Sequence, residues 1–287
     1  NTVMEAYIKK NVTDNPISRG LLTDINHHQF NQYILFKENL LKRQIVKDFS
    51  QDDAQSLLRF LRARNFDIEL SVQMFTNYLD WRRDQDFEGL LKMRFENTRE
   101  LTAVYPRFYH GTDKIGRPIY IELLSQTHFE EIFKTVNEEN LEKMVYKEYE
   151  NYVKNRLPMC SKVKGSPIEQ SFVIFCVKDV GLGFAMKAKK FLAKFSKVTN
   201  DYYPEMLGHS FIINASGTFK FIWAIASKFI DQKTQRKITI MGSDYINKLK
   251  ELVDLDNVPK ILGGNCTCPG YEGGCMYSDI GPWNMGQ

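Results

Sequence analysis

The chain lacks several features that would define its function at once. Its 287 residues carry a formal net charge of only +4, which is too small to make nucleic acid the main partner. Residues 1–14 show no apolar core of a secretory signal. No apolar run approaches the roughly twenty residues that span a bilayer. We therefore expect a globular protein without a transmembrane segment.

Cysteine is scarce, and its pattern suggests no disulfide framework. Five cysteines are an odd number, which favours reduced thiols in the cytosol. Cys266, Cys268 and Cys275 form a C-x-C-x6-C pattern in a glycine-rich stretch. A zinc site needs four ligands, and no histidine lies nearby in the sequence. The pattern therefore favours a disordered or loosely packed thiol loop, and we assign no metal ligand.

Credible catalytic motifs are also lacking. Gly181 and Gly183 begin an incomplete dinucleotide fingerprint, because Met186 stands at the third glycine position. The two glycines of Gly111-x4-Gly116 are followed by Arg-Pro rather than by the Lys-Ser/Thr of a phosphate loop, and a hairpin turn is the better interpretation. Residues 208–212, GHSFI, lack the second glycine of a nucleophile elbow. The sequence therefore predicts that the protein is not an enzyme. The alternative function class, a hydrolase or a kinase, is disfavoured by these three incomplete motifs.

The order of elements predicts an α/β fold with an all-helical lobe at its N-terminus. The chain reads as helical to about residue 100, with Asp67 as the N-cap of one helix and Arg59, Arg62 and Arg64 on the basic face of another. Strand-like runs then appear at 118–124, 171–178, 210–215 and 237–241, with helical stretches at 138–156 and 184–198 between them. This alternation indicates a mainly parallel sheet covered on both faces.

Residues 217–230, GTFKFIWAIASKFI, are apolar on nearly every side of a short helix. A surface helix would show a single apolar stripe. A buried core helix is the ordinary interpretation, but the polar segment DQKTQRK and a strand follow, which favours a lid. We expect this segment, called the gate helix below, to pack on the protein and to be exposed part of the time to an apolar partner through its large apolar side chains: Phe219, Phe221, Ile222, Trp223, Ile225 and Phe229.

Residues 184–198 are expected to form a basic amphipathic helix. Four lysines recur at helical spacing on one face and phenylalanines on another. Such a helix can lie on an anionic membrane, or it can be a plain surface helix packed on the sheet. The candidate membrane-facing residues are Lys187, Lys190, Lys194 and Lys197.

A series of motifs resembles the CRAL-TRIO lipid-transfer family, and most closely the fungal and plant phosphatidylinositol/phosphatidylcholine transfer proteins. The segments are LLRFLRARNFD (57–67), WRRD (81–84), YHGTDKIGRPIY (109–120), YENYVKNRLPMCS (149–161), YYPEMLG (202–208), FIINA (211–215), VPKILGG (258–264) and SDIGPW (278–283). The resemblance implies a helical lobe at 1–100, a lipid-binding lobe at 101–265 whose sheet floors an apolar cavity closed by the gate helix, and a Cys-containing tail at 266–287.

The resemblance also implies two head-group sites. The phosphatidylinositol positions are Arg64, Glu205, Thr234 and Lys237. The phosphatidylcholine positions are Tyr109, Tyr120, Tyr149, Ser171 and Thr199. The chain departs from the family at Asn65, where a lysine is usual, and at Val173 and Cys176, which stand for a threonine and an aspartate.

The function implied is phosphatidylinositol and phosphatidylcholine binding and exchange between membranes, with presentation of phosphatidylinositol to a lipid kinase. The alternatives are a carrier of another hydrophobe such as a sterol, suggested by Val173 and Cys176, and a lipid sensor that does not transfer. No cofactor is expected beyond the phospholipid cargo, and no nucleic acid. The implied location is cytoplasmic, with transient visits to Golgi, endosomal or plasma membranes.

Overall fold

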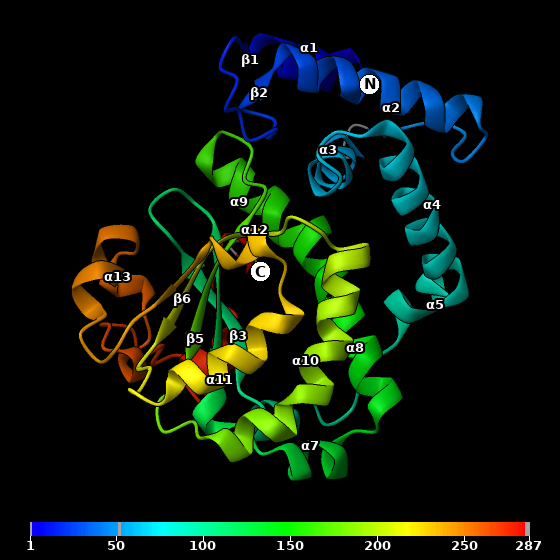
Figure 1. The fold of residues 1–287 in the computed structure, drawn as a ribbon. Helices are drawn as coiled ribbons and strands as arrows, with labels where there is room; N and C mark the ends of the chain where they lie inside the picture. Colours follow the sequence, from blue (N-terminus) through cyan, green and yellow to red (C-terminus); the bar gives the residue numbers. More distant parts are fainter. Residues whose placement is uncertain (1, 51–52, 285–287) are drawn as a thin grey trace. The chain divides into compact units, whose positions relative to one another are not determined.

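The computed structural model describes residues 2–50 and 53–284, and the chain divides into two compact units. The first unit comprises residues 1–91 and 198–206, and the second comprises 92–197 and 207–287. The mainly helical first region and the mainly parallel sheet of the second unit confirm the predicted fold class (Figure 1).

The first unit is built from helices around an aromatic core. They are α1 (Thr2–Lys10), α2 (His27–Lys42), α3 (Asp53–Ala63), α4 (Ile68–Asp84) and most of α5 (Phe87–Lys92), with two short strands, β1 (Val12–Thr13) and β2 (Ile25–Asn26). Asp67 caps α4 as predicted, since its side chain accepts a hydrogen bond from Leu70 N at 2.9 Å. The predicted basic face of α3 is wrong for Arg59 and Arg62, because both are buried; Arg62 donates to Gly20 O at 2.9 Å.

A five-stranded sheet organises the second unit. Its strands are β3 (Arg107–Thr112), β4 (Pro118–Leu123), β5 (Ser171–Cys176), β6 (Leu207–Ile213) and β7 (Ile238–Ile240), and they lie side by side in chain order. β3 and β4 form an antiparallel hairpin, and the other neighbours pair in parallel. The hairpin confirms the interpretation of the glycines at 111 and 116, whereas β3 itself was missed from the sequence.

The remaining helices connect or flank these strands. They are α6 (Thr98–Val104), α7 (Phe129–Thr135), α8 (Glu138–Asn151), a π-helical turn (Tyr152–Arg156), α9 (Leu157–Lys164), α10 (Leu182–Tyr202), α11 (Phe219–Ala226), α12 (Gln232–Gln235), α13 (Ile246–Leu252) and α14 (Cys275–Ser278). The last five residues of α10 belong to the first unit.

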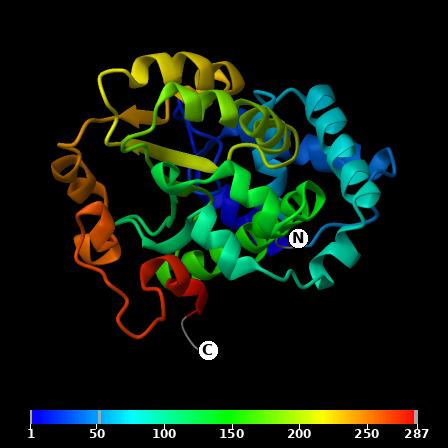
Figure 2. The ribbon, with the colours of Figure 1, turned by 90° about the horizontal axis from the view of Figure 1, so that it is seen from below.

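The strand order decides which face of the sheet each helix covers. When parallel strands follow one another in chain order, right-handed crossovers place every connecting helix on the same face. In the second unit α8, α10 and α11 indeed lie on one side of the sheet, and α13 lies on the other (Figures 1 and 2). The two faces therefore have different partners and different chemistry.

The face toward α13 is the larger core of the second unit. It contains alternate strand residues, among them Phe108, Ile121, Ile174 and Phe211, packed against Leu249 of α13. Cys268 and Cys275 are buried in the same cluster. The expectation of a disordered or loosely packed thiol loop is therefore wrong, because the segment after residue 265 completes this core.

Candidate functional site

The opposite face of the sheet changes from polar to apolar across the strands. One row of paired residues runs Tyr109, Tyr120, Val173, Ser210 and Ile238 from β3 to β7. The next row runs Arg107, Glu122, Phe175, Ile212 and Ile240. Side chains alternate between the faces of a strand, so both rows share one face. The face is charged and aromatic at β3 and β4 and, apart from Ser210, apolar at β6 and β7.

Two oppositely charged side chains and several tyrosines form the polar end. Arg107 and Glu122 are register partners, and Glu122 is only 9% exposed. The Tyr120 hydroxyl donates to Glu122 Oε2 at 3.2 Å, and the guanidinium of Arg107 lies over the Tyr105 ring, 4.7 Å from its centroid. Tyr149 of α8 is an electrostatic neighbour of both Arg107 and Glu122. The cluster holds paired charges, as buried charges must be.

A second arginine extends the cluster along β3. Arg156, from the π-helical turn, lies 4.3 Å from the centroid of Tyr109 and 5.1 Å from that of Trp283. Its guanidinium forms ion pairs with Glu148 at 3.0 Å and with Asp279 at 3.2 Å. π-helical turns inside helices frequently occur at functional sites. Here the turn brings a buried arginine against the tyrosines.

Burial controls protonation in this cluster. Desolvation raises the pKa of Glu122 above its ordinary value, although Arg107 and hydrogen bonds from Tyr105 and Tyr120 oppose the rise. Desolvation likewise raises the pKa of Tyr109 and Tyr120 well above the ordinary range. The tyrosines therefore stay neutral.

The apolar end is covered by the predicted gate helix, now α11 followed by the 3-10 turn Ser227–Phe229. Phe219 and Ile222 are buried and form a cluster with Ile212 and with Phe175 and Ile238. Phe221 on the other side is 53% exposed. The helix thus has one apolar side toward the sheet and one toward solvent.

The structure brings together part of the predicted phosphatidylcholine set. Tyr109 and Tyr120 have ring centroids 5.2 Å apart, and Tyr149 is an electrostatic neighbour of Tyr109. Ser171 is buried on β5, two residues before Val173, whereas Thr199 belongs to the other unit. The head-group roles of all five residues stay predictions.

The charged members of the cluster were not predicted from the sequence. These are Arg107, Glu122, Glu148, Arg156 and Asp279. Part of the signal was present, because period-two alternation in RFYHGT and PIYIEL places Arg107 beside Tyr109 and Glu122 beside Tyr120 on one strand face. Without the expectation of β3, that alternation had no strand to act on.

The predicted phosphatidylinositol residues fall in different units. Thr234 lies in α12 and Lys237 just before β7, where the Lys237 ammonium donates to Leu207 O at 3.0 Å. Burial alone would raise the pKa of Asp231, but hydrogen bonds from Thr234 and the charge of Lys237 lower it, so this carboxylate is ionised beside them. Arg64 and Glu205 belong to the first unit. The set stays a prediction.

Asn65 follows Arg64 in the loop after α3. Its φ of 50° is left-handed, a conformation that asparagine adopts more readily than most residues. The departure from the family's lysine at this position therefore has a local backbone reason.

Most of the predicted basic face of α10 is neutralised within the second unit. Lys187 pairs with Glu130 at 2.7 Å, and Lys190 lies 3.7 Å from Glu138. Lys194 pairs with Glu138 at 2.9 Å and also with Glu142. These contacts with α7 and α8 weaken the case for a membrane-facing role of the three lysines. The membrane-facing role of all four predicted lysines, Lys197 included, stays a prediction.

Cys176 does not lie on the tyrosine face. It belongs to the core cluster beneath α13, and its sulfur accepts from Asn214 Nδ2 at 3.4 Å. This position on the other face of β5 does not support the suggestion that Cys176 favours another cargo. Val173, in contrast, stands between Tyr120 and Ser210 on that face.

The chain thus combines a helical unit with an α/β unit whose sheet has one amphipathic face, and models of known protein families match both parts. The model of the CRAL/TRIO domain matches residues 103–264, and that of the CRAL/TRIO N-terminal domain matches residues 29–77. The chain belongs to the CRAL/TRIO family. Within the described residues, no helix combines the length and apolarity needed to cross a membrane.

Individual relatives show which members of the family this chain resembles. The chain is 40% identical over 263 residues to phosphatidylinositol/phosphatidylcholine transfer protein SFH7 of Arabidopsis thaliana, covering 91% of this chain but 48% of that protein. It thus spans about half the length of that relative. It is 39% identical to the Sec14 cytosolic factor of Schizosaccharomyces pombe, covering 82% of each chain. The solved structure of Sfh5 matches with a TM-score of 0.53 over 92% of this chain and 84% of Sfh5 at 16% identity, and supports the fold alone.

Proposed function

We propose that this chain binds phosphatidylcholine and phosphatidylinositol alternately and exchanges them between membranes. The observation that carries the proposal is the graded sheet face, polar at β3 and β4 and apolar beneath α11. A phospholipid has the same two-part chemistry, a charged head group and apolar tails. Two relatives add support, since one is named as a phosphatidylinositol/phosphatidylcholine transfer protein and one as Sec14.

The tyrosine end suits a choline head group. A quaternary ammonium ion is attracted to aromatic faces, by about 0.5–2 kcal/mol for each well-placed ring. Tyr109, Tyr120 and Tyr149 offer such faces, and the nearby Glu122 offers a carboxylate. Arg107 brings a positive charge that suits the phosphate. We assign phosphatidylcholine to this end.

We assign the inositol lipid to Thr234 and Lys237 of the second unit, while the roles of Arg64 and Glu205 of the first unit stay predictions. Lysine and arginine suit the phosphate, and threonine and glutamate suit inositol hydroxyls. Asp231 ionised beside Lys237 adds an acceptor for those hydroxyls. The two head groups then use different residues, so substitutions can separate them.

Exchange requires an apolar route for the tails. About thirty methylene and methyl groups at about 0.8 kcal/mol each make escape into water cost on the order of 20 kcal/mol. A gate that touches the leaflet removes that barrier, because the tails then pass between two apolar surroundings. We assign the gate to α11, where the exposed Phe221 meets the membrane and Phe219 and Ile222 rest on the sheet.

The same proposal extends to the location of the protein in the cell and to its lack of catalytic activity. We propose that the protein is not an enzyme, works in the cytosol as the name of its Sec14 relative suggests, and visits membrane surfaces transiently. Presentation of phosphatidylinositol to a lipid kinase is the proposed outcome of exchange. The absence of intact catalytic motifs in the sequence supports this view.

Transfer of fluorescent phosphatidylcholine and phosphatidylinositol between vesicles tests the two-site proposal. Lys237→Ala is expected to abolish phosphatidylinositol transfer and to spare phosphatidylcholine transfer. Tyr120→Leu is expected to lower phosphatidylcholine transfer by about 2- to 30-fold, the loss of one ring contact, and to spare phosphatidylinositol transfer. Lys248→Ala, which removes an exposed lysine of α13 on the other side of the sheet, is the control.

Equal loss of both lipids in either variant, with a native circular dichroism spectrum, contradicts the two-site assignment. Mass spectrometry of co-purified lipid separates the alternative of a sterol or another hydrophobe, which Val173 alone now favours. A bound lipid that stays on the protein during vesicle exchange identifies a sensor instead.

A further inference from the structure

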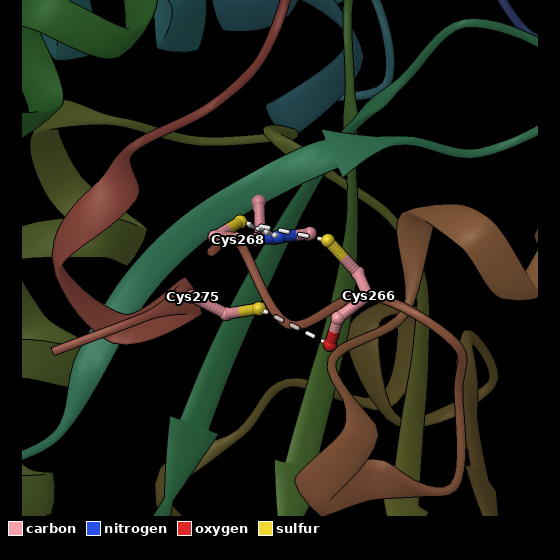
Figure 3. Close-up of side chains that lie close together, drawn as sticks. Cys266, Cys268 and Cys275 are labelled. Carbon is pink, nitrogen blue, oxygen red and sulfur yellow. Dashed lines mark hydrogen bonds between the residues drawn. The ribbon is translucent and has the colours of Figure 1, made fainter. Parts of the chain in front are cut away.

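The cysteines near the C-terminus meet a histidine from a distant strand. His110 on β3 is 1% exposed, and its Nε2 lies 3.3 Å from the sulfur of Cys268. The sulfurs of Cys266 and Cys268 are 3.5 Å apart, and Cys275 closes the group. All four potential ligand atoms lie within 4.8 Å of one another. Figure 3 shows how the three cysteines face one another. No pattern in the sequence indicates that residue 110 lies close to residues 266–275.

The spacing fits one tetrahedral ion. Zinc binds thiolate sulfur at about 2.3 Å and imidazole nitrogen at about 2.0 Å, which places neighbouring ligands about 3.4–3.8 Å apart at tetrahedral angles. The distance from His110 Nε2 to the Cys268 sulfur, 3.3 Å, lies just below this range, and that between the sulfurs of Cys266 and Cys268, 3.5 Å, lies within it. The thiols are free, since a disulfide would bring two sulfurs to about 2.05 Å.

The histidine is oriented for ligation. Its Nδ1 lies 3.1 Å from the backbone carbonyl oxygen of Asn257, an acceptor that requires the proton on Nδ1. Nε2 therefore presents its lone pair to the sulfurs. Metal-binding histidines almost always donate their second nitrogen in this way.

The backbone holds the cysteine segment in place. Lys260 N donates to Cys266 O at 2.8 Å, and Cys266 N donates to Val258 O at 3.1 Å. Gly264 permits this close approach, because a Cβ there would overlap the Val258 carbonyl. Cys275 begins α14 directly after two glycines with positive φ, which turn the chain back toward Cys268.

We propose that His110, Cys266, Cys268 and Cys275 form a structural zinc site. Three thiolates and one imidazole complete a closed four-coordinate set, the arrangement of structural rather than catalytic zinc. Cys266 is the most accessible ligand, since Cys268 and Cys275 are 5% and 9% exposed, which gives the ion an entry path.

The site would fasten the free edge of the sheet. β3 is an edge strand, and its Gly111 N–H donates to Ile280 O of the C-terminal segment at 2.7 Å. The same segment places Trp283 6.0 Å from Tyr109, on the opposite face of β3 from His110. Zinc therefore stabilises a clasp around the strand that carries part of the tyrosine cluster.

Elemental analysis of the full chain, purified reduced and without chelator from zinc-supplemented cells, tests the site. The wild type is expected to carry about one zinc ion per chain, and Cys268→Ser or His110→Ala to retain less than about a tenth of that amount. Cys160→Ala is the matched control and keeps the zinc, because this buried thiol lies outside the cluster and burial raises its pKa to about 12.

Cobalt titration of chelator-stripped wild type gives a second reading that does not depend on a variant folding. Thiolate-to-cobalt absorption with tetrahedral ligand-field bands supports the site. Fully reduced protein that takes up neither zinc nor cobalt overturns it. So does iron in place of zinc, or a disulfide within the cluster in protein kept reduced.

Discussion

Ser210 offers a sharp test of how the sheet face is built. Its side chain is fully buried in the middle of β6, between Val173 and Ile238. Among residues 2–50 and 53–284, its hydroxyl oxygen has no hydrogen-bond partner. A buried polar group without a partner costs about 1–3 kcal/mol. Ser210→Ala removes that penalty together with only one oxygen atom.

We expect the lipid-free variant to be more stable than the lipid-free wild type by about 1–2 kcal/mol. For a unit of this size, each kcal/mol raises the melting temperature by about 2–4 °C. Differential scanning calorimetry of delipidated protein, with urea unfolding for the free energy, measures the change. Ser161→Ala is the matched control in the same unit, because its hydroxyl accepts from Ile168 N at 2.8 Å and donates to Leu157 O at 2.7 Å. That variant is expected to lose stability.

Phospholipid supplies the second half of the test. A lipid oxygen over this face would give the Ser210 hydroxyl the partner it lacks. The rise in melting temperature on loading phosphatidylcholine is then smaller for Ser210→Ala than for the wild type. A lipid-free variant that is less stable than the wild type refutes the reasoning, since the hydroxyl must then have a partner.

Two further predictions concern charge and the gate. Burial raises the pKa of Glu122, so the folded state holds this proton more tightly than the unfolded state. The resulting contribution to stability is complete below pH 4.5, the ordinary pKa of the group, and is lost as the pH rises through the pKa in the folded state. Urea unfolding at a series of pH values should show Glu122→Gln gaining on the wild type as pH rises, and parallel profiles would contradict the assignment. Phe221→Glu should slow vesicle-to-vesicle transfer by about tenfold or more, because burial of one phenylalanine in the leaflet is worth about 1.5–3 kcal/mol, while leaving bound lipid unchanged; equal transfer rates would exclude this residue from membrane contact.

The local pattern of the sequence predicted much of the fold. Nearly continuous apolar runs located β4, β5, β6 and β7, because strands buried on both faces need apolar residues on both. Asp67 identified the start of α4 through its capping chemistry. The density of apolar residues around Trp223 located α11. β3 was missed because Arg107, His110 and Gly111 break the apolar run, and their partners are supplied by other elements.

The sequence by itself determined the family, the alternation of strands and helices, and the tyrosines and gate residues as candidates, because these depend on residue type and short spacing. The tertiary structure alone decided which side chains meet. It placed Cys176 in the core away from the tyrosines, paired three lysines of α10 with glutamates, and joined Arg107 to Glu122. It also brought His110 to three cysteines far along the chain. The nearest of the recorded contacts, 3.3 Å, joins His110 to Cys268, which lies 158 residues later in the sequence. Contacts between distant residues depend on strand order and on the path of the chain around the sheet edge, which no local pattern encodes.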